Sequence, residues 1–200
     1  MIDDCTVVIL AGGESTRMGQ DKASVELANE ALLNRAIGNM QPLFARLLIS
    51  VKEPKNNLLF PQICDQGAGQ GPMMGIATAL AQIDTRWLFV IACDMPFASA
   101  DLIQAMAQKR GDERQVIVPM AHGVMQPLCA FYAKSCLPVL HAQIEKGERS
   151  LKQAIGRLDA IVLSENECRQ YDSELLSFFD LDTMDDVARA EVVLKEKLNL

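Results

Sequence analysis

Residues 6–22 read TVVIL followed by AGGESTRMGQDK, an apolar run that leads directly into a glycine-rich, basic loop. A short apolar run rich in β-branched residues is typical of a strand that a parallel sheet buries on both faces. The glycines of the loop lack a Cβ atom, so the backbone can adopt positive φ and turn successive N–H groups toward an anion. Arg17 and Lys22 add a planar fork of donors and a compact positive charge. The stretch therefore predicts a strand that ends in a phosphate-binding loop.

Two better-known glycine-rich loops do not match this stretch. A P-loop requires Gly-x-x-x-x-Gly-Lys followed by Ser or Thr, and a dinucleotide-binding turn requires Gly-x-Gly-x-x-Gly after the first strand. Neither pattern occurs here. From spacing alone, residues 11–22 could also be a tight turn between a strand and a helix in which Arg17 and Lys22 are simply solvated.

The composition favours one compact domain that covers residues 1–200. The chain has 200 residues, of which 50% are hydrophobic, and this length suits a single α/β unit with a sizeable core. We expect a nucleotide-binding half at about residues 1–110 and an acceptor-side half at about residues 111–200. The net charge of −7 argues against a nucleic-acid partner, because such proteins carry basic surfaces that displace counterions from phosphates.

The cysteines and the N-terminus indicate a cytoplasmic protein. The six cysteines include no Cys-x-x-Cys pair and no neighbouring histidine, so reduced thiols are favoured over a zinc site or disulfides. The acidic start, Met-Ile-Asp-Asp, does not resemble a signal peptide, and no apolar run approaches the roughly 18 residues of a membrane span. His122 and His141 are too few and too far apart to indicate a metal site or acid-base catalysis.

Strand and helix patterns alternate along the chain and predict a doubly wound, mostly parallel α/β sheet. The expected helices are 31–40, 73–83, 101–110, 134–146, 150–158 and 184–198. After the first strand, the expected strands are 46–51, 59–64, 87–93, 115–120, 128–132, 160–163 and a short one at 178–181. Residues 165–174 are expected to form a polar loop.

Ligands of open α/β sheets bind at the carboxyl ends of the strands, and several polar residues are expected at that edge. Ser50 and Asp65 end or follow predicted strands, and Asp94 follows the most apolar one. A carboxylate there is costly unless it is paired or binds a cation. Asp94 could instead cap a helix, but Ser99 is better placed to cap the next one. Asp94 is therefore a candidate metal ligand.

The loop and several later motifs together resemble the molybdenum cofactor guanylyltransferases, a branch of the nucleotide-diphospho-sugar-transferase-like fold. Residues 10–22 carry Leu-Ala-Gly-Gly-x-Ser-x-Arg-Met-Gly-x-Asp-Lys, which is similar to the signature of that family. The other matching motifs follow in the order of the family and cover essentially the whole chain: Asp65, Gly71-Pro72-Met73-Met74-Gly75, Cys93-Asp94-Met95-Pro96-Phe97, Gln126-Pro127-Leu128, Gly147-Glu148-Arg149-Ser150 and Asp180-Leu181-Asp182-Thr183.

The resemblance implies that the terminal phosphate of molybdenum-carrying molybdopterin attacks the α-phosphate of GTP. Pyrophosphate leaves and the guanine dinucleotide cofactor forms. By position, the implied catalytic residues are Arg17, Lys22 and Asp94. The implied nucleotide-binding residues are Leu10, Ala11, Gly12, Gly13, Lys22, Ser50, Asp65, Gly71 and Asp94. Asp94 and Asp182 are the implied ligands of Mg²⁺, with Mn²⁺ as the alternative metal.

Two of these positions depart from the pattern of the family, and other functions stay open. Ser50 and Asp182 stand where relatives often have Asn. One rival is a nucleotidyltransferase of the same fold that acts on cytidine nucleotides or sugar phosphates, and another is a non-catalytic module that senses nucleotides. The resemblance also suggests transient contacts with cofactor-synthesis proteins or apo-molybdoenzymes, and no contact with a membrane.

Overall fold

The computed structural model describes residues 1–12, 22–56, 58–64 and 71–198. Three residues expected at the site, Gly13, Arg17 and Asp65, lie outside this part of the chain. Gly12 and Lys22, at the two ends of the glycine-rich loop, lie within it.

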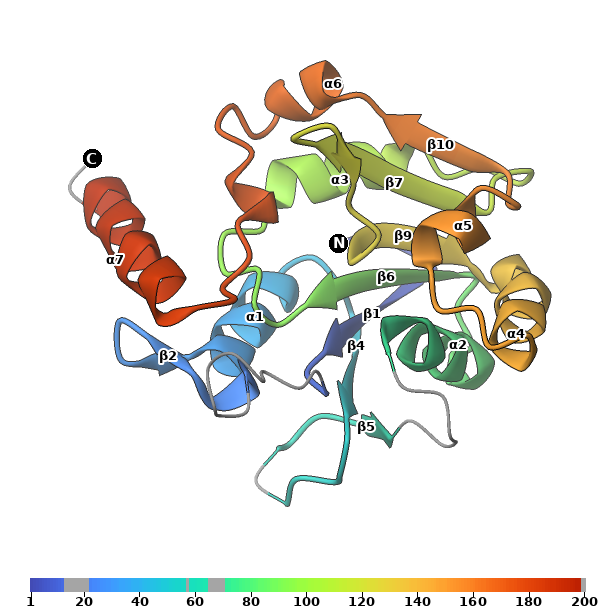
Figure 1. The fold of residues 1–200 in the computed structure, drawn as a ribbon, viewed down its shortest axis with the longest axis horizontal. Coiled ribbons are helices and arrows are strands. Elements are labelled where there is room, and N and C mark those ends of the chain that lie inside the picture. The colour runs from blue at the N-terminus through green and yellow to red at the C-terminus, as the bar shows by residue number, and fades with distance from the viewer. Residues whose placement is uncertain (13–21, 57, 65–70, 199–200) are drawn as a thin grey trace.

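A mostly parallel sheet forms the centre of the molecule (Figure 1). Its strands are β1 (Cys5–Leu10), β4 (Arg46–Val51), β5 (Gln62–Cys64), β6 (Trp87–Ala92), β7 (Val116–Ala121), β9 (Cys129–Ala133) and β10 (Ala160–Leu163). Their order across the sheet is β10-β7-β9-β6-β1-β4-β5. The strands β1, β4, β5 and β6 pair in parallel, while β9 runs antiparallel to both β6 and β7. β8 (Val124–Met125) pairs with the end of β7, and β2 (Glu26–Leu27) forms a separate hairpin with β3 (Glu30–Ala31).

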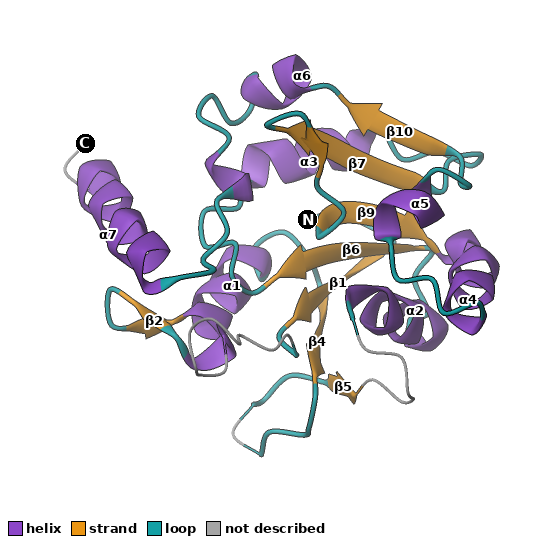
Figure 2. Cartoon of the chain, viewed as in Figure 1, coloured by secondary structure: helices purple, strands orange, loops and turns teal. Residues whose placement is uncertain are grey.

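Helices cover both faces of this sheet (Figure 2). One face packs against α1 (Leu32–Met40), α3 (Ala100–Gln108) and α6 (Glu165–Arg169), and the other against α2 (Pro72–Gln82), α4 (Leu137–Glu145) and α5 (Leu151–Ile155). Short 3₁₀ turns are η1 (Lys22–Ser24), η2 (Lys134–Cys136) and η3 (Leu176–Phe178). The prediction of a doubly wound, mostly parallel α/β fold is confirmed.

The last helix, α7 (Met184–Leu198), belongs to a small hydrophobic cluster of its own. Val187 and Ala190 of α7 pack with Val25 and Leu27 from the β2 segment and with Phe97 from the loop after β6. In Figure 1 this helix lies beside the β2 hairpin, away from the sheet. The β2 hairpin was not predicted, because its two-residue strands are too short to show an alternating pattern.

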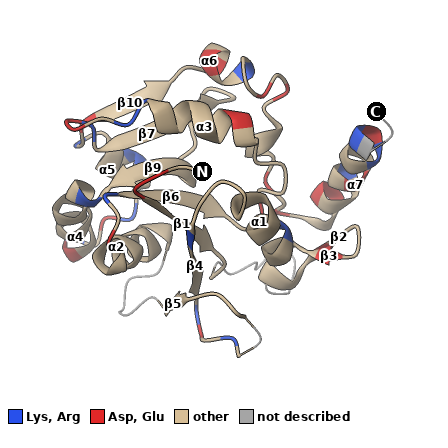
Figure 3. Ribbon diagram, turned by 180° about the vertical axis from the view of Figure 1, so that it is seen from behind, with Lys and Arg blue, Asp and Glu red and all other residues tan. Residues whose placement is uncertain are grey.

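Aromatic packing organises the core on the α1 and α3 face of the sheet. The rings of Phe44 and Phe89 stack with their centroids 5.3 Å apart, and Phe131 lies 4.6 Å from Phe89. The guanidinium group of Arg110 covers Phe131 and Trp87 at 5.3 and 5.9 Å. Strands β1, β6 and β9 contain no charged residue, and Figure 3 shows the charged positions elsewhere, on helices, loops and other strands.

Two expectations at the C-terminal end are wrong. Residues 165–169 form α6 and not a loop: the Ser164 side chain accepts a hydrogen bond from the N–H of Glu167, and the Glu167 carboxylate accepts one from the N–H of Ser164. The helix is too short to show a periodic pattern. Residues 178–181 form no strand; the Asp172 carboxylate accepts hydrogen bonds from the N–H groups of Leu176 and Ser177 and thereby starts the turn η3.

The other predicted elements appear with small changes of length. The strand at 59–64 is limited to β5, and the helix at 150–158 is limited to α5. All six cysteines are free, as predicted. No helix in the described part of the chain combines the length and apolar character needed to cross a bilayer.

We expect Phe89→Ala to lower the free energy of unfolding by about 3–5 kcal/mol, because it removes the middle ring of the aromatic cluster and leaves a cavity. Urea denaturation followed by circular dichroism measures this change. Leu59→Ala is the matched control, since the Leu59 side chain is 98% exposed and its removal should change little. Equal effects of the two substitutions would contradict the role given to the cluster.

Candidate active site

The carboxyl ends of β1, β4 and β6 meet at one edge of the sheet. Leu10 is in register with Ser50 on one side and with Ala92 on the other. Beyond these pairs, the N–H of Ala11 donates to the carbonyl of Ser50 at 2.8 Å, and the N–H of Cys93 donates to the carbonyl of Leu10 at 3.1 Å. The segments that begin at Ala11, Lys52 and Cys93 therefore leave the sheet side by side.

Gly12 is packed closely against the end of β4. A Cβ atom at this position would lie 3.3 Å from the backbone N of Lys52 and 3.5 Å from the carbonyl carbon of Val51. Because the neighbouring atoms are backbone, little room exists for a side chain. The glycine thus allows the start of the loop to approach the neighbouring strand, whereas the sequence suggested positive φ and close approach to an anion; Gly12 itself does not have positive φ.

Ser50 lies at the predicted edge but is buried, with 3% of its surface exposed. Its carbonyl is used by Ala11, so the structure gives it a part in joining β1 to β4. Its contact with a nucleotide stays a prediction.

Lys22, Asp94 and Asp182 form the polar centre of this edge. The Nζ atom of Lys22 donates hydrogen bonds to Oδ2 of Asp94 and to Oδ1 of Asp182, each at 2.5 Å. The side chains of Lys22 and Asp94 are 17% and 14% exposed, whereas that of Asp182 is 49% exposed. Partial burial lowers the pKa of Lys22, but the hydrogen bonds to Asp182 and Asp94 outweigh this effect and raise the pKa above its usual value. The sequence predicted that Lys22 binds phosphates, whereas in the structure it pairs with both aspartates.

Asp180 adds a third carboxylate to this centre, and sequence reasoning gave it no role. Loss of solvent around its carboxyl group is the largest cause that raises the pKa of Asp180 to about 6, although part of the residue stays exposed. The negative charges of Asp94 and Asp182 act in the same direction, while Lys22 opposes them. The acidic Asp180-Leu181-Asp182 motif was the available signal, but its distance to Asp94 was not readable.

The backbone around Asp182 is held by Asp186, the third residue of α7. Its Oδ2 atom accepts hydrogen bonds from the N–H groups of Asp182 and Thr183, at 3.2 and 2.8 Å, and from the Thr183 hydroxyl at 2.7 Å. The bond from that hydroxyl is the largest cause that lowers the pKa of Asp186 to about 2, and Arg189 also contributes. In the sequence, Thr183 followed three residues later by Asp186 resembles a capping box, and the hydrogen bonds between these two residues confirm it. It orients Asp182 toward Lys22.

The segment before Asp182 is attached to the end of β6. The N–H of Leu181 donates to the carbonyl of Asp94 at 3.1 Å. Earlier in the segment, the Ser177 hydroxyl accepts a hydrogen bond from the N–H of Ser99 at 2.8 Å. The Ser99 side chain itself accepts from the N–H of Leu102, which confirms Ser99 as the cap of α3. Residues about 80 positions apart are thereby brought to the same edge.

The first turn of α2 follows β5 at this edge. Gly71 has φ of +125°, a conformation that residues with a side chain rarely adopt. Pro72 occupies the first turn, where its missing N–H is not needed. Free N–H groups at the start of a helix suit an anion.

Gln126 and the two histidines do not take part in the polar centre formed by Lys22, Asp94 and Asp182. The Gln126 amide donates to the carbonyls of Ala121 and Val124, at 3.4 Å each, and thereby supports the β7–β8 hairpin. His122 and His141 are exposed. In the part of the chain that the structure describes, no three His, Cys, Asp or Glu side chains are grouped closely enough to hold a metal by themselves.

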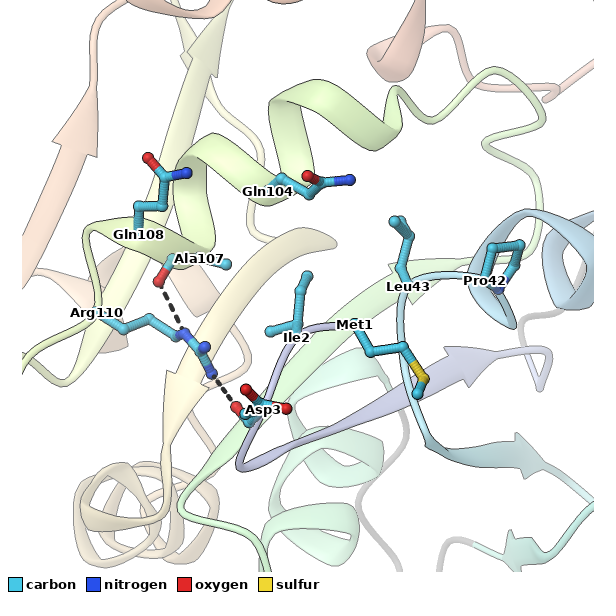
Figure 4. Close-up of a pocket in the computed structure, with 9 residues that line it drawn as sticks. All are labelled: Met1, Ile2, Asp3, Pro42, Leu43, Gln104, Ala107, Gln108 and Arg110. Carbon is cyan, nitrogen blue, oxygen red and sulfur yellow. Dashed lines mark hydrogen bonds between the residues drawn. The ribbon is translucent and has the colours of Figure 1, made fainter.

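A pocket of about 360 Å³ lies at the opposite, amino edge of the sheet (Figure 4). Arg110 contributes to its wall, but this side chain donates to the carbonyls of Ala107 and Asp3 at 2.9 and 3.2 Å. The pocket is separated by the length of the strands from Lys22, Asp94 and Asp182, so it is not part of the candidate site.

The family model of the MobA-like NTP transferase domain matches residues 7–161. The chain belongs to this family. The matched region includes the glycine-rich loop, Lys22 and Asp94, whereas Asp182 and its cap lie beyond it.

Two relatives of similar length are both named as molybdenum cofactor guanylyltransferases. A "Probable molybdenum cofactor guanylyltransferase" of Natranaerobius thermophilus is 33% identical, over 97% of this chain and 98% of the relative. A molybdenum cofactor guanylyltransferase of Desulfosudis oleivorans is 29% identical, also over 97% of this chain and 98% of the relative.

Solved structures agree with the fold. Molybdopterin-guanine dinucleotide biosynthesis protein A of Archaeoglobus fulgidus superimposes with a TM-score of 0.85 at 28% identity, covering 96% of this chain and 99% of that one. The 2-C-methyl-D-erythritol 4-phosphate cytidylyltransferase of Thermus thermophilus gives a TM-score of 0.69 at 18% identity, covering 95% and 98%. The latter likeness concerns the fold alone.

We expect Asp186→Ala to lower the free energy of unfolding by about 1–2 kcal/mol, because it removes the side chain that caps α7. Asp185→Ala is the matched control: it removes the same charge from the same turn, and Asp185 is exposed. Thermal unfolding of both variants measures the difference. Similar stability of the two variants would show that the cap contributes nothing beyond charge.

Proposed function

We propose that the chain transfers the GMP moiety of GTP to the terminal phosphate of molybdenum-carrying molybdopterin, which forms the guanine dinucleotide cofactor. The observation that carries this proposal is the meeting of Lys22, Asp94 and Asp182 at the carboxyl edge, in a chain whose full-length relatives are named guanylyltransferases. Positive and negative groups placed together there suit a reaction between two phosphates.

The proposed reaction is a displacement at phosphorus. An oxygen of the acceptor phosphate forms a bond with the α-phosphorus of GTP, the bond to the bridging oxygen breaks, and pyrophosphate leaves. The acceptor oxygen is already anionic at neutral pH, so no general base is required. Catalysis then depends on positioning the reactants and on neutralising their charge.

We assign the triphosphate and guanosine to the edge formed by β1 and α2. Leu10, Ala11 and Gly12 follow one another at the end of β1, and the start of α2 after Gly71, where the helix dipole favours an anion, lies at the same edge. Gly13, Arg17, Ser50 and Asp65 complete the proposed set; of these, only Ser50 lies in the described part of the chain. Arg17 and Lys22 are assigned to charge neutralisation.

The donor set suits a divalent cation, and we propose Mg²⁺, with Mn²⁺ as the alternative. Asp94 and Asp182 direct two carboxylates toward one point, the Nζ atom of Lys22. Mg²⁺ is commonly held by one or two carboxylates together with substrate phosphates, so the lack of a third ligand in the described residues is no obstacle. When bound, the ion supplies positive charge beside the phosphate oxygens.

We place the acceptor in the second half of the chain. Residues 126–128 and 147–150 of the acceptor-side half carry motifs of the family, and we assign the molybdopterin to that half. A cytoplasmic location and transient contacts with cofactor-synthesis proteins or apo-molybdoenzymes fit this place in cofactor assembly.

The rival functions have less support. A cytidylyltransferase activity rests on likeness in fold at 18% identity. A non-catalytic nucleotide sensor could hold a phosphate with Lys22 alone. It would have no need for the carboxylates of Asp94 and Asp182 beside that lysine.

We expect Asp94→Asn to reduce GMP transfer at least about 100-fold with the fold intact, because the amide keeps the shape of the side chain and loses the charge that binds the metal. Product formation from GTP and molybdenum-carrying molybdopterin measures the loss. Asp101→Asn is the control, as Asp101 is an exposed acid in the first turn of α3. Near-normal turnover of Asp94→Asn would contradict the assignment.

We expect the enzyme to prefer GTP over ATP and CTP by at least about tenfold in kcat/KM, because a site that pairs the N–H donors of guanine leaves its acceptors unpaired with other bases. ITP is the sharpest comparison, since it lacks only the 2-amino group. Comparable kcat/KM for CTP and GTP would support the cytidylyl alternative.

A further inference from the structure

The Nζ atom of Lys22 occupies the point toward which Asp94 and Asp182 both direct a carboxylate oxygen. Each of these oxygens lies 2.5 Å from the nitrogen. An ammonium group that pairs closely with two carboxylates neutralises charge that would otherwise repel across the site. A cation is therefore already held by the two residues expected to bind the metal.

A divalent ion bridging the same oxygens would need almost the same position. Mg²⁺ binds oxygen at about 2.0–2.1 Å, so it would come into contact with the ammonium group of Lys22. Two positive charges at that separation repel strongly in a partly buried site. The ion and Lys22 cannot both bind Asp94 and Asp182 through these oxygens.

We propose that Lys22 and the divalent cation bind Asp94 and Asp182 alternately, so that arrival of the metal releases Lys22 toward the triphosphate. This inference rests on the proposed function for the identity of the second ligand, a nucleoside triphosphate. It assigns to Lys22 two positions, one in the metal-free protein and one in the loaded site.

The local structure allows the side chain to move while its backbone stays in place. The carbonyl of Lys22 accepts a hydrogen bond from the N–H of Val25, and the next residue, Ala23, is buried. The side chain of Lys22 is 17% exposed and that of Asp182 is 49% exposed, so the pair is open to solvent on one side. Rotation about the bonds of the lysine stem is sufficient for the exchange.

The exchange couples metal binding to nucleotide binding. Without a nucleotide, Lys22 competes with the ion, and the apparent dissociation constant rises as the fraction of molecules with an open site falls. With a nucleotide, the triphosphate offers Lys22 a new partner and the metal new ligands. Each ligand then strengthens the binding of the other.

The test is the affinity for Mn²⁺ alone, measured by electron paramagnetic resonance on wild-type protein and Lys22→Met without nucleotide. The matched control is Lys109→Met, which also removes one positive charge: Lys109 is exposed and pairs with Glu167 at 3.3 Å. We expect Lys22→Met to bind Mn²⁺ at least about tenfold more tightly than wild type, and Lys109→Met to bind as wild type does. Unchanged or weaker binding by Lys22→Met overturns the proposal.

A second measurement follows the metal in wild-type protein and uses a variant only to identify the Lys22 resonance. In wild-type protein labelled with ¹³C at the lysine ε carbon, Mg²⁺ titration without nucleotide should shift the Lys22 resonance, which the Lys22→Met or Lys22→Arg spectrum identifies. Saturation of the protein with Mg²⁺ and no shift of Lys22 would falsify the exchange. Both readouts concern metal binding and not transfer, so absence of guanylyl transfer would refute the proposed function while leaving this result intact.

Discussion

Parallel pairing of β1 with β4 and β6 is the constraint on which the site depends. Because Leu10 is in register with both Ser50 and Ala92, the chain leaves the sheet at three adjacent points on one edge. Gly12 keeps the first of these segments close to β4, and Asp94 is the second residue of the third. A slip of one residue in either pairing would turn every side chain of the shifted strand to the other face. Backbone hydrogen bonding between these strands therefore brings the segments that carry the charged centre to one edge of the sheet.

The second element of the site comes from far along the chain. Asp182 reaches Lys22 because the N–H of Leu181 binds the carbonyl of Asp94 and because Asp186 caps the helix that follows. These contacts link residues near positions 22, 94 and 182 without a common strand or helix. Lys22 joins the carboxylates of Asp94 and Asp182, and the negative charges of these two residues also act on Asp180. The negative charge of the site suits a cation brought in with an anionic substrate.

Much of the fold was readable from sequence because β1, β4, β6 and α7 have clear apolar patterns and unambiguous ends. The position of Asp94 followed from the strand before it. The antiparallel course of β9 was not readable, since an apolar pentapeptide looks the same in either direction. The contact of Lys22 with Asp94 and Asp182, and the proximity of Asp180, depend on tertiary structure across 72 and 160 positions of sequence. Short elements such as α6 gave only a capping signal.

The hydrophobic cluster around α7 is separate from the core of the main sheet, so we expect the two parts to unfold locally at different free energies. Proteins open locally in cooperative units, and a unit with a small core opens at a lower free energy than the main sheet. Asp182 is attached to that small unit, whereas Lys22 and Asp94 lie next to the sheet. Partial opening of α7 would therefore take the carboxylate of Asp182 away from Lys22 and Asp94 while the sheet stays folded.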